Sequence, residues 1–351
     1  ERTDIINLKF FNNFIMAIYI IFTYILYKFN DNNRFIAEPS IRLQSYTSLG
    51  ENSFEPRFGF KYNVNERIRL KGSFGKFSQN LMSTSSERDV VNLFSGYLSS
   101  TTSLPETFLS EDVETSLQKS THYIVGLEYQ IGLNLDINLE GYIKNFSQLI
   151  AENKNQVFDD TPEFEAEEDY LKKDFIVERG CASGLDLLIK YSDKRINIWS
   201  VYSFGIIERE DEIQLYSPHY DRRHNFNFVF NYLIDRKKTW EFGLRWNFGS
   251  GFPFTKTQAY YEELNLNDNL NQNFEFSNGN LGILYSDLNT GRLPSYHRLD
   301  ISLKKKFSFS KFNELEISTG LTNVYNRKNI FYYNRVDAIR VNQLPIIPSL
   351  G

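Results

Sequence analysis

The sequence predicts an all-β protein, an antiparallel transmembrane β-barrel, and three observations support this fold class. Many segments of about ten residues alternate apolar and polar side chains, which suits a tilted strand that crosses a bilayer. The connections between these segments alternate between tight turns and long loops. Aromatic residues reach 16% of the chain, with 31 Phe and 22 Tyr, and barrels carry aromatic girdles at both membrane interfaces.

Residues 133–144 show the alternation most clearly. Leu135, Ile137 and Leu139 fall on one face, whereas Asp136 and Asn138 fall on the other, because successive side chains of a strand point to opposite faces. We therefore predict a lipid-facing apolar face and a polar face toward the lumen. Further alternating segments are predicted at residues 57–63, 67–74, 123–129, 184–191, 196–198, 225–232, 240–248, 298–304 and 314–321.

The order of the connections gives the membrane orientation. Tight turns are predicted at 63–66, 131–132, 192–194, 235–238 and 308–311, and long loops at 78–120, 146–180, 208–221 and 250–296. A soluble sandwich has no reason to keep its long loops at one end. A barrel in an outer membrane does, because tight turns face the periplasm and long loops face outside.

The chain divides into an atypical apolar segment, residues 1–33, and a barrel region, residues 34–351. Residues 14–26 are apolar on both faces and too short for a spanning helix. We predict a first strand here, which turns at 30–33 into a strand at 35–44. A short membrane-associated helix or a non-native sequence end is the alternative. Glu1 and Asp4 do not fit a secretory signal, so we expect the chain to be mature or incomplete.

Bulk composition excludes several classes of protein. Hydrophobic residues are 41% of the 351 residues and the mean hydropathy is −0.43, which argues against a helical membrane bundle. A net charge of −5 gives no reason to expect a nucleic-acid partner. Cys181 is the single cysteine and cannot form an internal disulfide, so we interpret it as incidental.

Residues with catalytic potential are few, and we predict no enzyme, catalytic residue, metal site or cofactor. The four histidines are His122, His219, His224 and His297. His219, Asp221 and His224 are close in sequence and keep an outer-membrane hydrolase open as an alternative, but a rim of ion pairs and stacked rings explains them equally well. The acidic residues of 159–169 lack the glycine and spacing of a calcium loop and are predicted to form a solvated external loop.

Four motifs follow one another along the barrel region, namely YSPHYDRRHN at 216–225, GFPFT at 251–255, GRLPSYHRLD at 291–300 and TNVYNRKN at 322–329. They resemble barrel segments of TonB-dependent receptors from Bacteroidota. LPIIPSLG at 344–351 resembles the lead-in to the closing strand of such barrels, and residues 57–79 and 122–150 are similar too. The resemblance covers residues 35–351.

The resemblance implies a location and a role. It implies a barrel in the bacterial outer membrane, in contact with the lipid bilayer, for uptake of a scarce nutrient such as an iron chelate, cobalamin or a glycan. Energy would come through TonB, which contacts a plug domain, and a surface lipoprotein is a further partner that the resemblance allows. It identifies neither the ligand nor the residues that bind it. The alternatives are a passive porin or smaller barrel, and an adhesive surface protein.

The sequence also departs from the family pattern. We find no plug, and twelve clear strands plus a partial one at 330–333 where the family has twenty-two. A last strand would be expected after Gly351. We therefore expect a barrel fragment that does not close by itself, since an open sheet edge in hydrocarbon leaves backbone groups unpaired.

Overall fold

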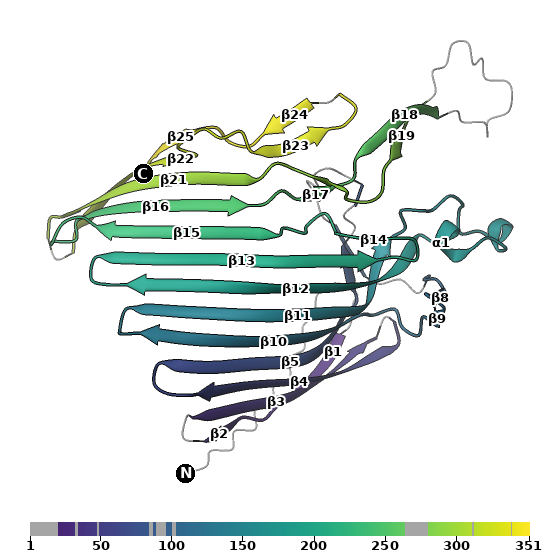
Figure 1. Cartoon of the computed structure of the whole chain (residues 1–351), viewed down its shortest axis with the longest axis horizontal. Helices are drawn as coiled ribbons and strands as arrows, with labels where there is room; N and C mark the ends of the chain where they lie inside the picture. Colours follow the sequence, from purple (N-terminus) through teal and green to yellow (C-terminus); the bar gives the residue numbers. More distant parts are fainter. Residues whose placement is uncertain are drawn as a thin grey trace.

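The computed structural model describes residues 20–31, 34–47, 49–83, 87–88, 96–99, 103–263, 280–310, 312–337 and 339–351. One large antiparallel sheet dominates it, and its strands lie side by side and follow the order of the chain (Figure 1). From edge to edge they are β1 (Ile20–Leu26), β3 (Phe35–Tyr46), β4 (Glu51–Asn63), β5 (Ile68–Gln79), β10 (Gln118–Ile131), β11 (Leu135–Glu152), β12 (Phe175–Ser192), β13 (Ile196–Glu210), β15 (His224–Leu233), β16 (Trp240–Gly249), β21 (Tyr296–Ser308), β22 (Glu314–Thr322) and β25 (Ile347–Leu350).

Short elements decorate this sheet. β2 (Phe29–Asp31) pairs with β3, and β14 (Leu215–Tyr216) pairs with β13. Five separate ribbons are β6 (Leu81–Ser83) with β7 (Tyr97–Ser99), β8 (Thr107–Phe108) with β9 (Glu111–Asp112), β17 (Pro253–Phe254) with β20 (Gly291–Arg292), β18 (Thr257–Glu263) with β19 (Asn280–Tyr285), and β23 (Ile330–Asn334) with β24 (Ile339–Asn342). The helical turns are η1 (Pro162–Phe164) and α1 (Asp169–Lys172). Among the described residues, no helix is both long enough and apolar enough to span a membrane.

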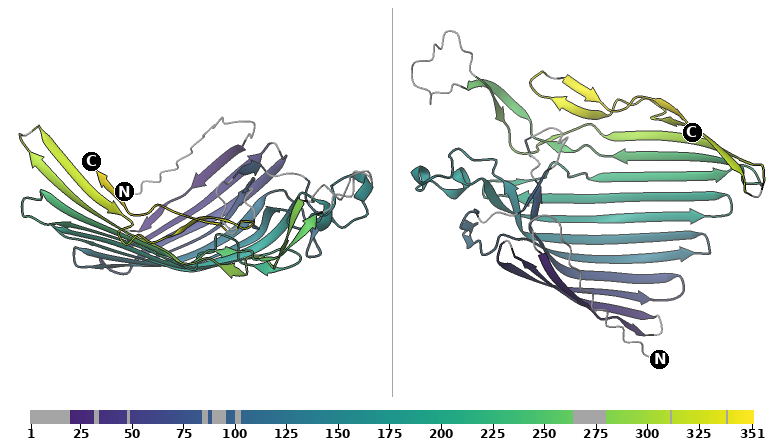
Figure 2. Two further views of the ribbon diagram at one scale, coloured as in Figure 1. Left: turned by 90° about the horizontal axis from the view of Figure 1, so that it is seen from above. Right: turned by 180° about the vertical axis from the view of Figure 1, so that it is seen from behind.

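The all-β antiparallel fold is confirmed, as a curved and open sheet. Seen from above, the sheet bends into a trough, with its first and last strands rising on opposite sides (Figure 2). In the described part of the chain its two outermost strands, β1 and β25, do not pair with each other.

Register preserves the two predicted faces across the sheet. Leu70, Leu127, Leu139 and Leu187 are successive partners on four neighbouring strands, and the first three are 39–42% exposed. One residue along, Lys71, Gly126, Glu140 and Asp186 are successive partners on the opposite face. Lys71 forms ion pairs with Glu128 and Glu140 there, so the polar face holds paired charges while the apolar face is available to lipid.

Several aromatic rings pack on one another on the apolar face. Phe74 packs on Tyr123 at 5.3 Å between ring centroids, Phe226 on Trp246 at 5.5 Å, and His297 on Tyr325 at 5.3 Å. Rings with a polar edge suit the boundary between hydrocarbon and headgroups, as in an aromatic girdle.

The predicted alternation of connections is present. Short turns follow β4, β10, β12, β15 and β21 at one end of the sheet, and the long connections lie at the other end (Figure 1). The connection 47–50, between β3 and β4, is a short exception at the loop end. The loop predicted at 146–180 is shorter than expected, because β11 continues to Glu152 and β12 begins at Phe175.

Three terminal predictions are refined. The partial strand at 330–333 is wrong as a barrel strand, because β23 pairs with β24 in a separate ribbon and leaves the main sheet. Residues 347–350 form β25, which pairs with β22. Of the predicted first strand at 14–26, β1 covers the part from Ile20 and pairs with β3, whereas residues 14–19 lie outside the described residues.

Candidate functional site

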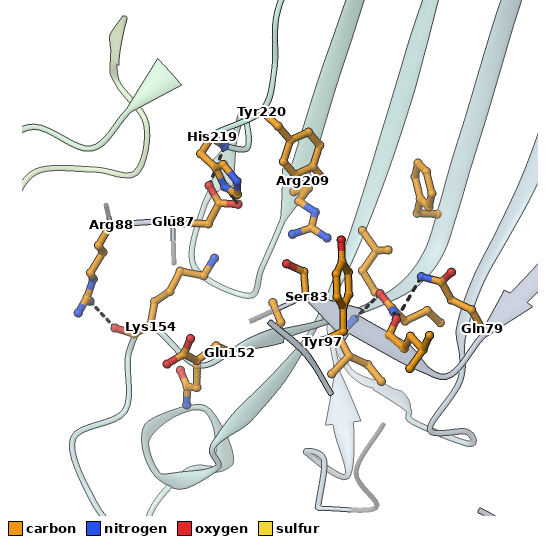
Figure 3. Close-up of a pocket in the computed structure, with 17 residues that line it drawn as sticks. Gln79, Ser83, Glu87, Arg88, Tyr97, Glu152, Lys154, Arg209, His219 and Tyr220 are labelled. Carbon is orange, nitrogen blue, oxygen red and sulfur yellow. Dashed lines mark hydrogen bonds and ion pairs between the residues drawn. The ribbon is translucent and has the colours of Figure 1, made fainter. Parts of the chain in front are cut away.

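A cavity of about 630 Å³ lies at the loop end of the sheet (Figure 3). Strands β5, β10, β11 and β13 supply part of its wall. The rest comes from β6, β7, residues 87–88, residues 153–154 and the connection between β14 and β15. Tyr97, Tyr220 and Phe146 give it aromatic surface, and Arg88, Lys154 and Arg209 give it positive charge. We call this the mouth cavity.

Glu87 joins three distant segments at this cavity. Its carboxylate accepts a hydrogen bond from the backbone N–H of His219 at 2.8 Å and contacts His219 Nδ1 at 3.0 Å (Figure 3). It also accepts a hydrogen bond from Asn289 Nδ2 at 2.7 Å. The side chain is 6% exposed. Burial raises the pKa of Glu87, but the contacts with His219 outweigh it and hold that pKa below its ordinary value. Glu87 is therefore a charged anchor between loops.

A second buried carboxylate, Glu178 on β12, organises the cations of the cavity wall. Glu178 is fully buried and contacts Lys154 Nζ at 2.7 Å and an Arg209 guanidinium nitrogen at 3.3 Å. Tyr216 donates its hydroxyl proton to the same carboxylate at 2.8 Å. Burial, and then the charge of Glu178, raise the pKa of Tyr216 above its ordinary value. These cations are thus compensated within the wall.

The motifs that the sequence analysis singled out meet next to the mouth cavity. Asp221, fully buried, binds Arg223 Nε at 2.8 Å and an Arg292 guanidinium nitrogen at 2.6 Å. Arg292 also donates to the backbone oxygens of Asp221 at 2.9 Å and of Gly251 at 3.3 Å. A Cβ on Gly251 would lie 1.6 Å from the backbone oxygen of Leu293, so only glycine fits. The 216–225, 251–255 and 291–300 motifs are therefore one structural clamp.

The fourth motif extends that clamp. Asn323 has a φ of 55°, in the left-handed region that asparagine tolerates. Its backbone N–H donates to Asp300 Oδ1 at 2.9 Å, and its side-chain amide donates to the backbone oxygens of Arg327 and Leu344, both at 3.0 Å. The 322–329 motif thus fixes the start of the β22–β25 connection against β21.

The candidate hydrolase residues do not form one catalytic group in the structure. His219 binds Glu87, Asp221 binds two arginines, and His224 contacts the hydroxyl of Tyr202 at 2.8 Å. His224 also packs on Phe204. These contacts match the ion pairs and stacked rings that the sequence analysis weighed against catalysis.

The remaining sequence candidates lie apart from the mouth cavity. His122 contacts the Ser120 hydroxyl and packs on Phe77, and His297 contacts the Tyr325 hydroxyl at 2.7 Å. Cys181 is exposed and its thiol lies 3.4 Å from Asn145 Oδ1. In the acidic loop, Asp160 pairs with Lys173 at 3.1 Å. Within the described residues no group of three or more His, Cys, Asp or Glu is arranged to hold a metal ion.

Sequence reasoning missed most of the mouth cavity. It named His219 but not its partner Glu87, and it did not single out Lys154, Glu178 or Arg209. The one available signal was Glu178, an acidic residue next to the apolar Ile176 and Val177 at the start of a strand.

Comparisons with known proteins agree with this geometry. The family described as TonB dependent receptor-like, beta-barrel matches residues 12–326. No curated protein matches the chain.

Several solved structures share the fold. FpvA of P. aeruginosa bound to heterologous pyoverdines is 11% identical, with a TM-score of 0.59 over 93% of this chain and 37% of that one. The siderophore receptor PirA of Acinetobacter baumannii is 12% identical, with a TM-score of 0.56 over 88% and 42%. The outer membrane transporter YddB of Escherichia coli is 11% identical, with a TM-score of 0.58 over 95% and 44%. The chain spans less than half the length of these proteins.

Family match and architecture lead to the same conclusion. The match covers most of the chain, and the sheet has the apolar face, the polar face and the one-sided long loops of a barrel in an outer membrane. The chain belongs to the TonB-dependent receptor-like β-barrel family and lies in the bacterial outer membrane.

Proposed function

We propose that the whole protein takes up a scarce nutrient across the outer membrane with energy supplied through TonB. The mouth cavity carries this proposal, because it lies where the long loops meet and opens among aromatic and charged side chains. Its volume of about 630 Å³ is within the range of small-molecule sites. The ligand would be caught there and would then pass along the polar face of the sheet.

An iron chelate is the ligand class that we propose first, with cobalamin and glycans as alternatives. Solved relatives of the fold include a siderophore receptor and a ferric citrate transporter, FecA. We further propose that TonB acts through a plug domain, that a surface lipoprotein is a partner, and that the source is a member of the Bacteroidota, as the motifs at 216–329 suggest.

We propose no catalytic activity for this barrel. The separate partners of His219, Asp221 and His224 support that view, since a hydrolase needs a nucleophile, a base and an orienting group in contact. Replacing His219 by Ala should therefore leave hydrolysis of ester and peptide substrates at the background of the parent protein.

An uptake assay tests the transport proposal. Cells that carry the full-length receptor as their only route for iron chelates would be given radioactive ferric citrate, and parallel cultures cyanocobalamin or maltohexaose. We expect uptake of one probe to saturate and to stop when a protonophore collapses the inner-membrane gradient. Replacing Tyr97, which lines the mouth cavity, by Ala should weaken that uptake, whereas replacing Tyr27, at the other end of the sheet, should not.

The same assay separates the alternative of a passive porin. Diffusion through a pore rises in proportion to probe concentration and does not depend on the gradient. Uptake with those two properties would contradict the proposal.

A further inference from the structure

A second cavity, of about 550 Å³, lies among the connection between β14 and β15 and the connections that follow β16 and β22. It shares no lining residue with the mouth cavity. Four cationic side chains line it, namely Arg222, Arg327, Lys328 and Arg340, and no carboxylate is present among its described lining residues. We call it the cationic cavity.

None of these four cations forms an ion pair with a carboxylate in the described part of the chain. Arg222 lies over the ring of Phe252 at 4.1 Å, and its Nε is buried without a hydrogen-bond partner. Arg327 donates to the backbone oxygen of Ser295 at 2.8 Å, and its Nε is likewise buried without a partner. Arg340 donates to Asn342 Oδ1 at 2.9 Å and to the backbone oxygen of Lys328.

Three cations at the same end of the molecule differ from this cluster because they have carboxylate partners. Arg292 binds Asp221, and Lys154 and Arg209 bind Glu178, although Arg209 Nε is also buried without a hydrogen-bond partner. Like charges that share a partly desolvated space repel one another, and a buried guanidinium nitrogen without an acceptor is costly. An anion that enters the cationic cavity would relieve the repulsion between the four cations.

Register places the cavity on the polar face of the sheet. A Cβ on Gly249 would lie 2.5 Å from Arg222 Cζ, so the guanidinium lies on the side to which residue 249 points. That side is shared with Asn247, whereas Phe248 points to the apolar face. Tyr296, which pairs with Gly249, has its ring 5.9 Å from Arg222 Cζ. Solutes in the lumen can therefore reach Arg222, and lipid cannot.

We propose that the cationic cavity is a second binding site, for the carboxylate or phosphate group of a soluble solute. Guanidinium groups present a planar fork of donors that matches both kinds of oxyanion. Arg222 lies in the connection between β14 and β15 and is held on Phe252, and Arg340 lies on β24. These two arginines would contact the anion, and Arg327 and Lys328 would add charge. Phe252 and Tyr296 offer ring faces for the uncharged part of the solute.

The proposal of this second site holds whichever solute binds in the mouth cavity. Its test therefore measures binding and not uptake. The protein would be purified in a neutral maltoside detergent and titrated calorimetrically with citrate and with inorganic phosphate. We expect saturable binding of at least one of them at low salt. Raising NaCl from about 50 to about 500 mM should weaken it, because salt screens charge pairs near a surface.

Four substitutions make the test specific. Arg222→Gln and Arg340→Gln each remove a charge and keep hydrogen-bonding groups, and each should weaken binding about tenfold or more, as expected for a hydrogen bond to a charged group. Arg222→Lys keeps the charge without the planar fork and should lose less. Arg236→Gln, in the tight turn between β15 and β16, makes the same charge change at the opposite end and should bind like the parent. Arg340 is exposed on the short ribbon β23–β24, so Arg340→Gln keeps the test valid if Arg222→Gln disturbs folding.

Two results would overturn the proposal. One is that the parent protein binds neither citrate nor phosphate, or that both Gln variants bind them as tightly as the parent does. The other is binding only to phosphatidylcholine vesicles that contain lipid A, lost in the Gln variants, because the anion would then be a lipid headgroup and not a soluble solute.

Discussion

At the scale of the residue, the mouth of this barrel is held by two buried carboxylates that act differently. Glu87 receives hydrogen bonds from His219 and Asn289, which belong to different connections. Glu178 instead neutralises Lys154 and Arg209. The first joins loops and the second keeps charged side chains in place beneath them.

Glu87→Ala should loosen the connection between β14 and β15. The backbone N–H of His219 would lose its acceptor, which costs about 1–3 kcal/mol for a buried group. Hydrogen exchange of a peptide that contains His219 should therefore accelerate about 10- to 100-fold if it occurs by local opening. Glu152→Ala, an exposed carboxylate of the same cavity, is the control. Equal exchange in both variants would contradict the anchor role.

The contribution of Glu87 should also depend on pH. Its pKa in the folded protein lies below the ordinary value, so the unfolded chain binds the proton first and the stabilisation is present at and above about pH 5. It should be lost as the pH falls through the lowered pKa. The difference in free energy of unfolding between the parent and Glu87→Gln should shrink as the pH falls from about 5 toward 3. A difference that grows over that same range would show the opposite linkage.

Glu178→Ala should be more damaging than the loss of an exposed carboxylate. It leaves Arg209 without a carboxylate partner among the described residues, and it leaves Lys154 with Asp211 at 3.6 Å, so we expect a cost of about 3–5 kcal/mol. Glu210→Ala breaks the solvent-exposed pair with Arg179 and should cost much less, because ion pairs at a surface contribute little to stability. The temperature at which each variant loses its folded band on a semi-native gel measures the contrast. Similar losses for both would mean that the buried cluster is not a stabilising unit.

At the scale of the element, each long strand has one face toward lipid and one face toward the lumen. Leu139 on β11 pairs with Leu127 and Leu187 on the apolar face, and the adjacent Asn138 lies on the polar face beside Glu140. A shift of one residue in register would exchange the two faces, so the alternation fixes the register.

Arginine substitutions on β11 test these faces. Leu139→Arg places a charge toward hydrocarbon and should cost about 2–4 kcal/mol, the range for a bilayer midplane. Asn138→Arg places it next to Glu140 and should cost much less. The free energies of unfolding in lipid vesicles give the comparison. If both variants are equally stable, the assignment of faces is incorrect.

At the scale of the whole molecule, the one-sided loops define the topology. After Cys181 is replaced by Ser, a cysteine at Glu163, in the connection between β11 and β12, should react with an impermeant maleimide on intact cells. A cysteine at Lys237, in the turn between β15 and β16, should react only after the outer membrane is permeabilised. Rapid labelling of the cysteine at position 237 in intact cells would show that the tight turns face outside, opposite to the predicted orientation.

The strands and turns could be predicted because their signals are local. The period of two in residues 133–144 depends only on which side chains meet lipid, and the turn at 192–194 lies between two such segments. The prediction of a barrel strand failed where the apolar pattern of a segment did not determine which strand it pairs with. The segment at 330–333 has the composition of a barrel strand, yet β24 is near enough in the chain to pair with it first.

The sequence by itself determined the all-β class, the two faces of the sheet, the order of short and long connections, and the family. The tertiary structure alone decided the two cavities and the groups that line them. Glu87 meets His219 across 132 positions and Asn289 across 202, so no local pattern could pair them. The cationic cavity is lined by four cations and by no carboxylate among the described residues. Which cations lack a carboxylate partner depends on how the connection between β14 and β15 packs against the connections after β16 and β22. The alternation of apolar and polar residues along each strand follows from its two surroundings, lipid and lumen. Contacts between loops depend instead on packing between residues far apart in the chain, which no local sequence pattern specifies.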